Sequence, residues 1–207
     1  MSDSRQMSTP AWLMDFTSNA AETFVTAYYA ASDSPQRSQL LPSLYLPNSS
    51  VSWNGNPISG AAQYAQWLEA QPGSRHEIQS FDCHPLGPYN AHEQNEAPSL
   101  LLVVSGTVAH YTPESIVTKD PSNAPKSATS TGGGSKKKFD ADAPIESYPR
   151  VFSQTFVLIN GAGTNTEGGV PFVWTPAKNN KNKNQTDPDL RTVAKYFIQA
   201  DSLRFVG

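Results

Sequence analysis

A small set of side chains in this sequence could carry out proton transfer. Asp82 and His84 lie two residues apart in a segment with strand character, and Tyr28, Tyr45 and Asp201 lie elsewhere in the chain. Carboxyl, imidazole and phenol groups act as general acids and bases where a fold gathers them in a pocket. The alternative is that Asp82 and Asp201 make structural hydrogen bonds and that His84 marks a strand end. The residue types alone leave both interpretations open.

The sequence gives little support for metal or phosphate chemistry. A single cysteine, Cys83, excludes an intrachain disulfide and a site built from cysteine alone. Residues 132–137 lack the glycine spacing, the following Ser or Thr and the preceding strand of a phosphate-binding loop. We therefore expect no metal, no cofactor and no small-molecule substrate. The histidines, which lack the spacing of a known metal site, are His76, His84, His92 and His110.

Lysines gather in two polar segments, 111–149 and 175–190. They could keep the loops solvated, or they could make weak contacts with RNA phosphates, which would be sequence independent and sensitive to salt. No aromatic residues alternate with them, so base stacking is not indicated. The candidate RNA contacts are Lys136, Lys137, Lys138, Lys178, Lys181 and Lys183.

The overall composition describes a core diluted by polar loops. The chain has 207 residues, of which 37% are hydrophobic and 16% charged, and its net charge of −3 disfavours a protein that coats nucleic acid. It lacks an apolar run long enough to span a membrane, and its first residues do not form a secretory signal. We expect a soluble intracellular protein with one domain over 1–207, a flexible leader at 1–11 and mobile insertions at 111–149 and 175–190.

The first third of the chain predicts three helices. Phe16, Ala20, Phe24 and Tyr28 recur every four residues, which predicts an amphipathic helix over 12–31. Ser34-Pro35 predicts the start of a shorter helix, and Ser59 can cap a third. Asn54-Gly55 between short apolar pieces predicts a hairpin. The shorter helix is expected to carry Leu40, Leu41 and Leu44 inward.

The rest of the chain has the alternation of strands. Strands are expected over 76–83, 100–110, 150–159 and 193–205, and a short piece at 170–174 could pair near the last of them. Helices followed by strands predict an α+β domain with the helices on one face of an antiparallel sheet. The residues expected beneath the helices are Leu100, Leu102, Val104, Val108, Phe152, Phe156, Leu158, Phe197, Leu203 and Phe205.

The opposite face of that sheet is small, mixed and almost uncharged. A sheet face exposed to water usually carries Lys and Glu, whereas Arg204 is the one formal charge expected here. The face is either an exposed surface rich in Ser and Thr or an interface, in which Arg is a frequent anchor. Its expected members are Ser105, Thr107, Ser153, Thr155, Val157, Tyr196, Ile198, Ala200, Ser202 and Arg204, together with Val103.

Several motifs, in order along the chain, resemble those of the nuclear transport factor 2-like family. More narrowly, they resemble the small subunit of the heterodimeric mRNA export receptor, of the fungal type. The motifs are Phe24-Val25-x-x-Tyr28-Tyr29, Leu44-Tyr45, Trp53-Asn54-Gly55-Asn56-x-Ile58-Ser59-Gly60, Asp82-Cys83-x-Pro85, Val103-Val104-x-Gly106-x-Val108, Phe152-x-Gln154-x-Phe156-x-Leu158 and Asp201-x-x-Arg204-Phe205.

The resemblance implies a cone of three N-terminal helices on a curved antiparallel sheet, with two long polar loop insertions. It implies a non-enzymatic adaptor whose open sheet face pairs with the similar domain of a larger subunit, with Arg204 bonded to an acidic residue there. The heterodimer would contact nucleoporins and support mRNA passage through the nuclear pore, shuttling between nucleus and cytoplasm without binding membranes. The insertion at 111–149 is longer than the family usually carries.

Two alternatives share the same fold. One is a homodimeric nuclear import carrier. The other is a small-molecule dehydratase or isomerase with its site inside the cone, using the proton-transfer residues named above. Aromatic residues are expected to crowd that interior and leave little room for a substrate: Phe16, Phe24, Trp53, Phe152, Phe156 and Phe205.

Overall fold

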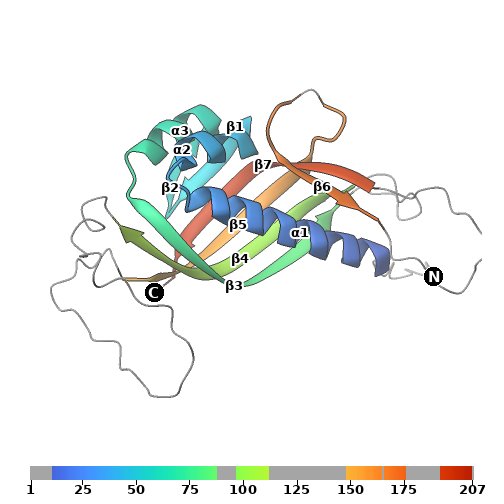
Figure 1. The fold of residues 1–207 in the computed structure, drawn as a ribbon, viewed down its shortest axis with the longest axis horizontal. Coiled ribbons are helices and arrows are strands. Elements are labelled where there is room, and N and C mark those ends of the chain that lie inside the picture. Colours follow the sequence, from blue (N-terminus) through green and yellow to red (C-terminus); the bar gives the residue numbers. More distant parts are fainter. Residues whose placement is uncertain (1–10, 88–96, 112–147, 165, 176–191, 207) are drawn as a thin grey trace, which may run out of the picture.

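The protein is described here by a computed structural model, which covers residues 11–87, 97–111, 148–164, 166–175 and 192–206. Within these ranges four helical segments precede most of a seven-stranded sheet (Figure 1). The helical segments are α1 (Ala11–Ser32), α2 (Arg37–Leu40), the 3₁₀ turn η1 (Leu41–Leu44) and α3 (Gly60–Glu69). The strands are β1 (Tyr45–Trp53), β2 (Asn56–Ser59), β3 (Gly73–Leu86), β4 (Ser99–Tyr111), β5 (Arg150–Asn160), β6 (Val170–Trp174) and β7 (Thr192–Phe205).

The long helix α1 lies along one face of the curved sheet (Figure 1). Its apolar residues at every fourth position are all buried, which confirms the predicted amphipathic helix. The Phe24 and Tyr28 rings meet the Phe156 ring of β5 with centroids 5.4 and 4.8 Å away. Both pairs meet edge to face, an arrangement that aromatic rings favour and that adds to the stabilisation from burial.

The second helix is shorter than predicted. Ser34 does not cap it; instead the Ser34 hydroxyl accepts the Gln36 N–H at 3.1 Å, and α2 begins at Arg37. After one turn the chain tightens into η1, where Leu41 and Leu44 are buried. Leu40, predicted to point inward, is 41% exposed. The change from α to 3₁₀ geometry alters the angle between successive side chains, so the three leucines do not share one face.

The predicted hairpin joins β1 and β2. Asn54 and Gly55 have φ values of 46° and 91°, the positive pair that a two-residue hairpin turn of type I′ requires. Ser59 stands at the N-terminal cap of α3, but its side chain makes no capping bond. The Gln63 side chain instead accepts the Ser59 N–H at 2.6 Å.

The strand order is β2-β1-β7-β5-β4-β3, and β6 also pairs with β7. The predicted antiparallel pairing is confirmed for every strand pair except β1 and β7, which are parallel. These two strands are far apart in sequence, so no hairpin fixes their relative direction. The predicted pairing of 170–174 with the last strand is confirmed.

A β-bulge at Gln199 corrects the predicted faces of β7. Val157 pairs with Ala200 and Leu158 with Ile198, which leaves Gln199 without an opposite residue. One extra residue reverses the alternation of side chains. Tyr196 and Ile198, predicted on the open face, are therefore in the core, at 1% and 0% exposure.

Phe197, predicted in the core, lies on the opposite side of the sheet from it. Its strand partner Ile159 alternates with the core residue Leu158. The Phe197 ring is covered by the β5–β6 connection, and it lies so near Gly161 and Gly169 that a Cβ at either glycine would come within 2.8 Å of it. One end of the open face is thus closed by the chain itself.

Candidate interaction surface

The open face is the side of the sheet that faces away from α1. Strand pairing aligns its side chains in three rows that cross β4, β5, β7 and, in two cases, β1. All the predicted members other than Tyr196 and Ile198 lie on this face, partly or fully exposed. The rows are Leu101–Val157–Ala200–Ser50, Val103–Thr155–Ser202–Ser52 and Ser105–Ser153–Arg204, and Thr107 lies beyond the last.

The rows are small and apolar or hydroxyl-bearing, and Arg204 is their charged residue. Sequence reasoning missed Leu101, although the alternation of β4 places it on the same face as Val103. It also missed the two β1 serines, because the β1–β7 pairing could not be foreseen. Further charged residues lie at the edge of this face on β3, where Glu77 and Asp82 stand opposite Thr107 and Val103. An uncharged centre with a charged rim is the usual composition of a protein interface.

Arg204 is exposed, and within the described residues its guanidinium makes no hydrogen bond or ion pair. It lies beside the β1–β2 turn, close to Gly55. The turn is fixed to β7 by two bonds, from the Asn54 N–H to the Leu203 carbonyl at 2.8 Å and from the Phe205 N–H to the Asn54 side-chain oxygen at 3.3 Å. The two motifs around Asn54 and Arg204, 150 residues apart in sequence, thus form one structural unit.

The proton-transfer candidates divide between two places. Asp82 and His84 lie exposed on the edge strand β3. Asp201, Tyr28 and Tyr45 lie in the core, where Asp201 is 4% exposed. Its carboxylate accepts hydrogen bonds from Tyr45 at 2.6 Å, Gln154 at 2.8 Å and Tyr28 at 3.4 Å. The prediction that Asp201 makes structural hydrogen bonds is confirmed.

The core network continues through neighbouring tyrosines. The Tyr29 hydroxyl donates to the Gln154 side chain at 2.8 Å, and the Tyr28 and Tyr64 hydroxyls are 3.5 Å apart. Burial raises the pKa of Asp201 to about 6, and the three hydrogen bonds limit the rise. Burial raises the pKa of Tyr64 to about 12. These groups satisfy one another inside the core, and their exposed fractions do not exceed 6%.

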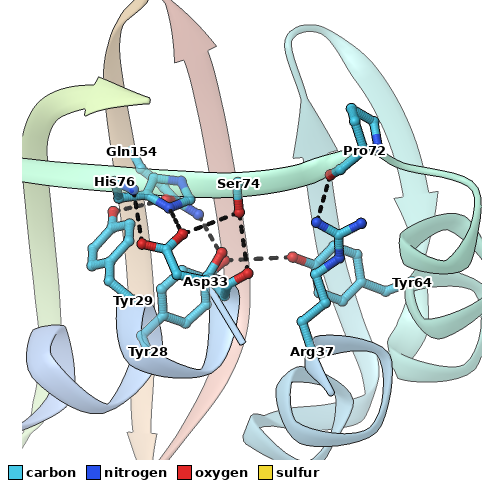
Figure 2. Close-up of polar contacts among 10 residues, drawn as sticks. Tyr28, Tyr29, Asp33, Arg37, Tyr64, Pro72, Ser74, His76 and Gln154 are labelled. Atoms are coloured by element: carbon cyan, nitrogen blue, oxygen red, sulfur yellow. Dashed lines mark hydrogen bonds and ion pairs between the residues drawn. The ribbon is translucent and has the colours of Figure 1, made fainter. Parts of the chain in front are cut away.

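Sequence reasoning missed a second polar cluster, where α1 ends against β3 (Figure 2). The Asp33 carboxylate contacts the His76 ring at 2.6 Å and accepts the His76 N–H at 2.8 Å and the Ser74 hydroxyl at 3.1 Å. Burial alone would raise the pKa of Asp33, but the hydrogen bonds from His76 outweigh it and lower that pKa. The Arg37 guanidinium nearby donates to the Pro72 carbonyl at 2.5 Å, which links α2 to the end of α3.

The remaining predictions concern metals, RNA and membranes. The described residues hold no cluster of three His, Cys, Asp or Glu side chains that could bind a metal ion. His92 and the RNA-contact candidates Lys136, Lys137, Lys138, Lys178, Lys181 and Lys183 lie outside the described residues. So does most of the predicted leader and of both insertions. Of the helices that the structure describes, none has the length and apolarity to cross a bilayer.

Three comparisons place the chain among known proteins. The nuclear transport factor 2 (NTF2) domain matches residues 20–114. The "NTF2-related export protein 1" of Bos taurus is 36% identical over 89 residues, which are 43% of this chain and 60% of that protein. The chain therefore spans less than two thirds of this relative's length.

Solved structures extend the likeness to nearly the whole chain. A chain of the Chaetomium thermophilum Mex67 NTF2-like domain complexed with Mtr2 has a TM-score of 0.51 and 16% identity, covering 92% of this chain and 98% of its own. A putative scytalone dehydratase from Novosphingobium aromaticivorans has a TM-score of 0.53 and 10% identity, covering 96% and 89%. At such identities the likeness concerns the fold alone. Residues 20–114 are therefore similar to the NTF2 domain, and the chain has the NTF2-like fold.

Proposed function

We propose that this protein is a non-enzymatic adaptor, the small subunit of an mRNA export receptor. The NTF2-like domain of a larger subunit packs on the open face, and the heterodimer carries mRNA particles through the nuclear pore. Its place of action is then the nucleus and the pore, with shuttling to the cytoplasm. Residues 1–207 act as one domain in this role.

The open face is the observation that carries the proposal. Its three rows offer a largely uncharged surface across four strands. Arg204 stands in it with no bonding partner among the described residues. A carboxylate supplied by the partner would satisfy the guanidinium, and such a pair fixes the register and choice of partner more than it adds affinity.

The comparisons support this choice of partner. The bovine relative is named an export protein. In one structural neighbour the NTF2-like domain of Mex67 is complexed with Mtr2, which is an association between proteins of the kind we propose. For this chain, the heterodimer, the contacts with nucleoporins and any contact of the loop lysines with RNA are parts of the proposal.

A catalytic role is the less favoured alternative, although the scytalone dehydratase neighbour has the same fold. A general base must reach its substrate. Here the Asp201 carboxylate is 4% exposed and already accepts three hydrogen bonds. The Phe24 and Phe156 rings, both fully buried, pack against Tyr28, one of the donors to that carboxylate.

Sedimentation velocity tests the proposal. The purified chain is measured alone and after mixing with the purified NTF2-like domain of the larger export subunit from the same organism. We expect a one-to-one complex in the mixture. A stable homodimer that does not exchange with the domain would contradict the proposal and favour the import-carrier alternative.

A further inference from the structure

Gly55 lies directly beside the guanidinium of Arg204. A Cβ atom built on Gly55 would stand 3.3 Å from Arg204 Nη1 and 4.0 Å from Arg204 Cζ. The first of these separations is shorter than an ordinary van der Waals contact between carbon and nitrogen, so the guanidinium would have to move by a few tenths of an ångström. The Arg204 guanidinium thus occupies space that a side chain at Gly55 would need.

The turn cannot move away to make that room. The Asn54 N–H is bonded to the carbonyl of Leu203, and the Phe205 N–H is bonded to the Asn54 side chain. These bonds fix the turn to the residues immediately before and after Arg204. A side chain added at position 55 would therefore displace the flexible guanidinium and not the backbone beneath it.

We propose that Gly55 is a positioning residue for the interface, because the lack of a side chain there leaves the Arg204 guanidinium the room for the orientation in which it meets a partner carboxylate. The inference rests on the function proposed above. It makes the Asn54-Gly55 turn part of the recognition surface, in addition to its role as the β1–β2 connection.

A purely conformational role for Gly55 is the competing explanation. Its φ of +91° is one that side-chain-bearing residues rarely adopt, so any substitution is strained. The chain provides a matched control in Gly163, which has a φ of +84° and no atom within 4 Å of its would-be Cβ. Alanine at Gly163 meets a similar backbone strain without touching Arg204.

The test measures the affinity for the larger subunit's NTF2-like domain by calorimetry, with melting temperatures recorded in parallel. We expect Gly55→Ala to weaken binding about tenfold, because position 55 is in contact with Arg204. We expect Gly163→Ala to weaken it less than twofold, because position 163 is not. In an Arg204→Ala background the Gly55→Ala effect should fall below twofold, since the group it displaces is gone. Should Gly55→Ala not fold, Gly55→Asn replaces it, because asparagine tolerates positive φ.

The outcomes separate the two proposals. Equal losses for Gly55→Ala and Gly163→Ala, or a Gly55→Ala loss that persists in the Arg204→Ala background, would overturn the positioning role and leave the heterodimer intact. A wild-type chain that does not bind the domain at all would overturn the proposed function, and the positioning role with it.

Discussion

The two faces of the sheet are built from alternate residues of the same strands, yet they differ in almost every property. On β5, Phe156 is fully buried against α1, whereas its neighbour Thr155 lies partly exposed in a row of small residues. Folding requires apolar side chains on the face that packs against α1 and places no such demand on the open face. The composition of the open face can therefore be adapted to binding.

Polar groups show the same contrast. Asp201 and Arg204 are three residues apart on β7. The Asp201 carboxylate has three hydrogen-bond donors and is almost fully buried. The Arg204 guanidinium is exposed and, within the described part of the chain, unbonded. A buried charge without partners would destabilise the fold, because it has lost its hydration. An exposed charge stays hydrated and remains available to a partner from another protein.

Truncating the core face should give the largest effect on stability. Phe156→Ala removes a fully buried ring and is expected to lower the free energy of unfolding by about 3–5 kcal/mol. Thr155→Ala, one residue away on the open face, should change it by less than about 0.5 kcal/mol. Urea denaturation of both variants checks the contrast. Similar losses at the two positions would show that the open face also supports folding.

The buried carboxylate should make stability depend on pH. The folded pKa of Asp201 is raised to about 6, above the unfolded value of about 3.9. Its contribution is therefore fully present below pH 4 and is lost as the pH rises to 6, by about 3 kcal/mol in total. Asp201→Asn cannot ionise and should lack this loss. A free-energy difference between variant and wild type that stays constant from pH 4 to pH 7 would contradict the burial of this charge.

The Asp33 carboxylate should behave in the opposite way. Its folded pKa is lowered, so its contribution is present above the unfolded pKa and is lost as the pH falls through the folded value. At pH 7, Asp33→Asn weakens the contacts with His76 and Ser74 and is expected to cost about 1–2 kcal/mol. The exposed carboxylate of Asp82 provides the control, since Asp82→Asn should be neutral within about 0.5 kcal/mol. Equal effects at pH 7 would mean that the Asp33 cluster adds no stability.

Periodicity was sufficient for most of the fold. The fourfold spacing of aromatic residues predicted α1, the Asn-Gly pair predicted the β1–β2 turn, and alternation placed β4 and β5 on the correct faces. It failed for Tyr196, Phe197 and Ile198, because a bulge is a local change of register that residue types do not signal. The parallel pairing of β1 with β7 was equally hidden, since it joins segments that are distant in sequence.

The candidate surface was predictable only in part. Arg204 stood out as the one charge among the residues predicted on the open face, and the structure places it exposed on that face. Its proximity to Gly55 depends on how a turn near residue 54 meets the last strand, which no spacing within either motif reveals. The Asp33–His76 contact likewise joins residues 43 positions apart at the end of a helix and the start of a strand.

The smallest effect on stability is expected for Arg204, the residue on which the proposed function most depends. Arg204→Glu should leave the unfolding midpoint unchanged, because the guanidinium is exposed and bonded to no other described residue. A reversed charge facing a partner carboxylate should weaken binding to the larger subunit's NTF2-like domain at least ~100-fold. Glu22→Arg, a charge reversal of equal size on the exposed side of α1, is the control and should bind as the wild type does.

Calorimetric titration of these three proteins with the purified domain tests the central claim most directly. The open-face interface predicts tight one-to-one binding for wild type and Glu22→Arg and a near-complete loss for Arg204→Glu, with all three equally stable. Wild-type affinity in Arg204→Glu, or an equal loss in Glu22→Arg, would contradict the assignment of the open face as the binding surface.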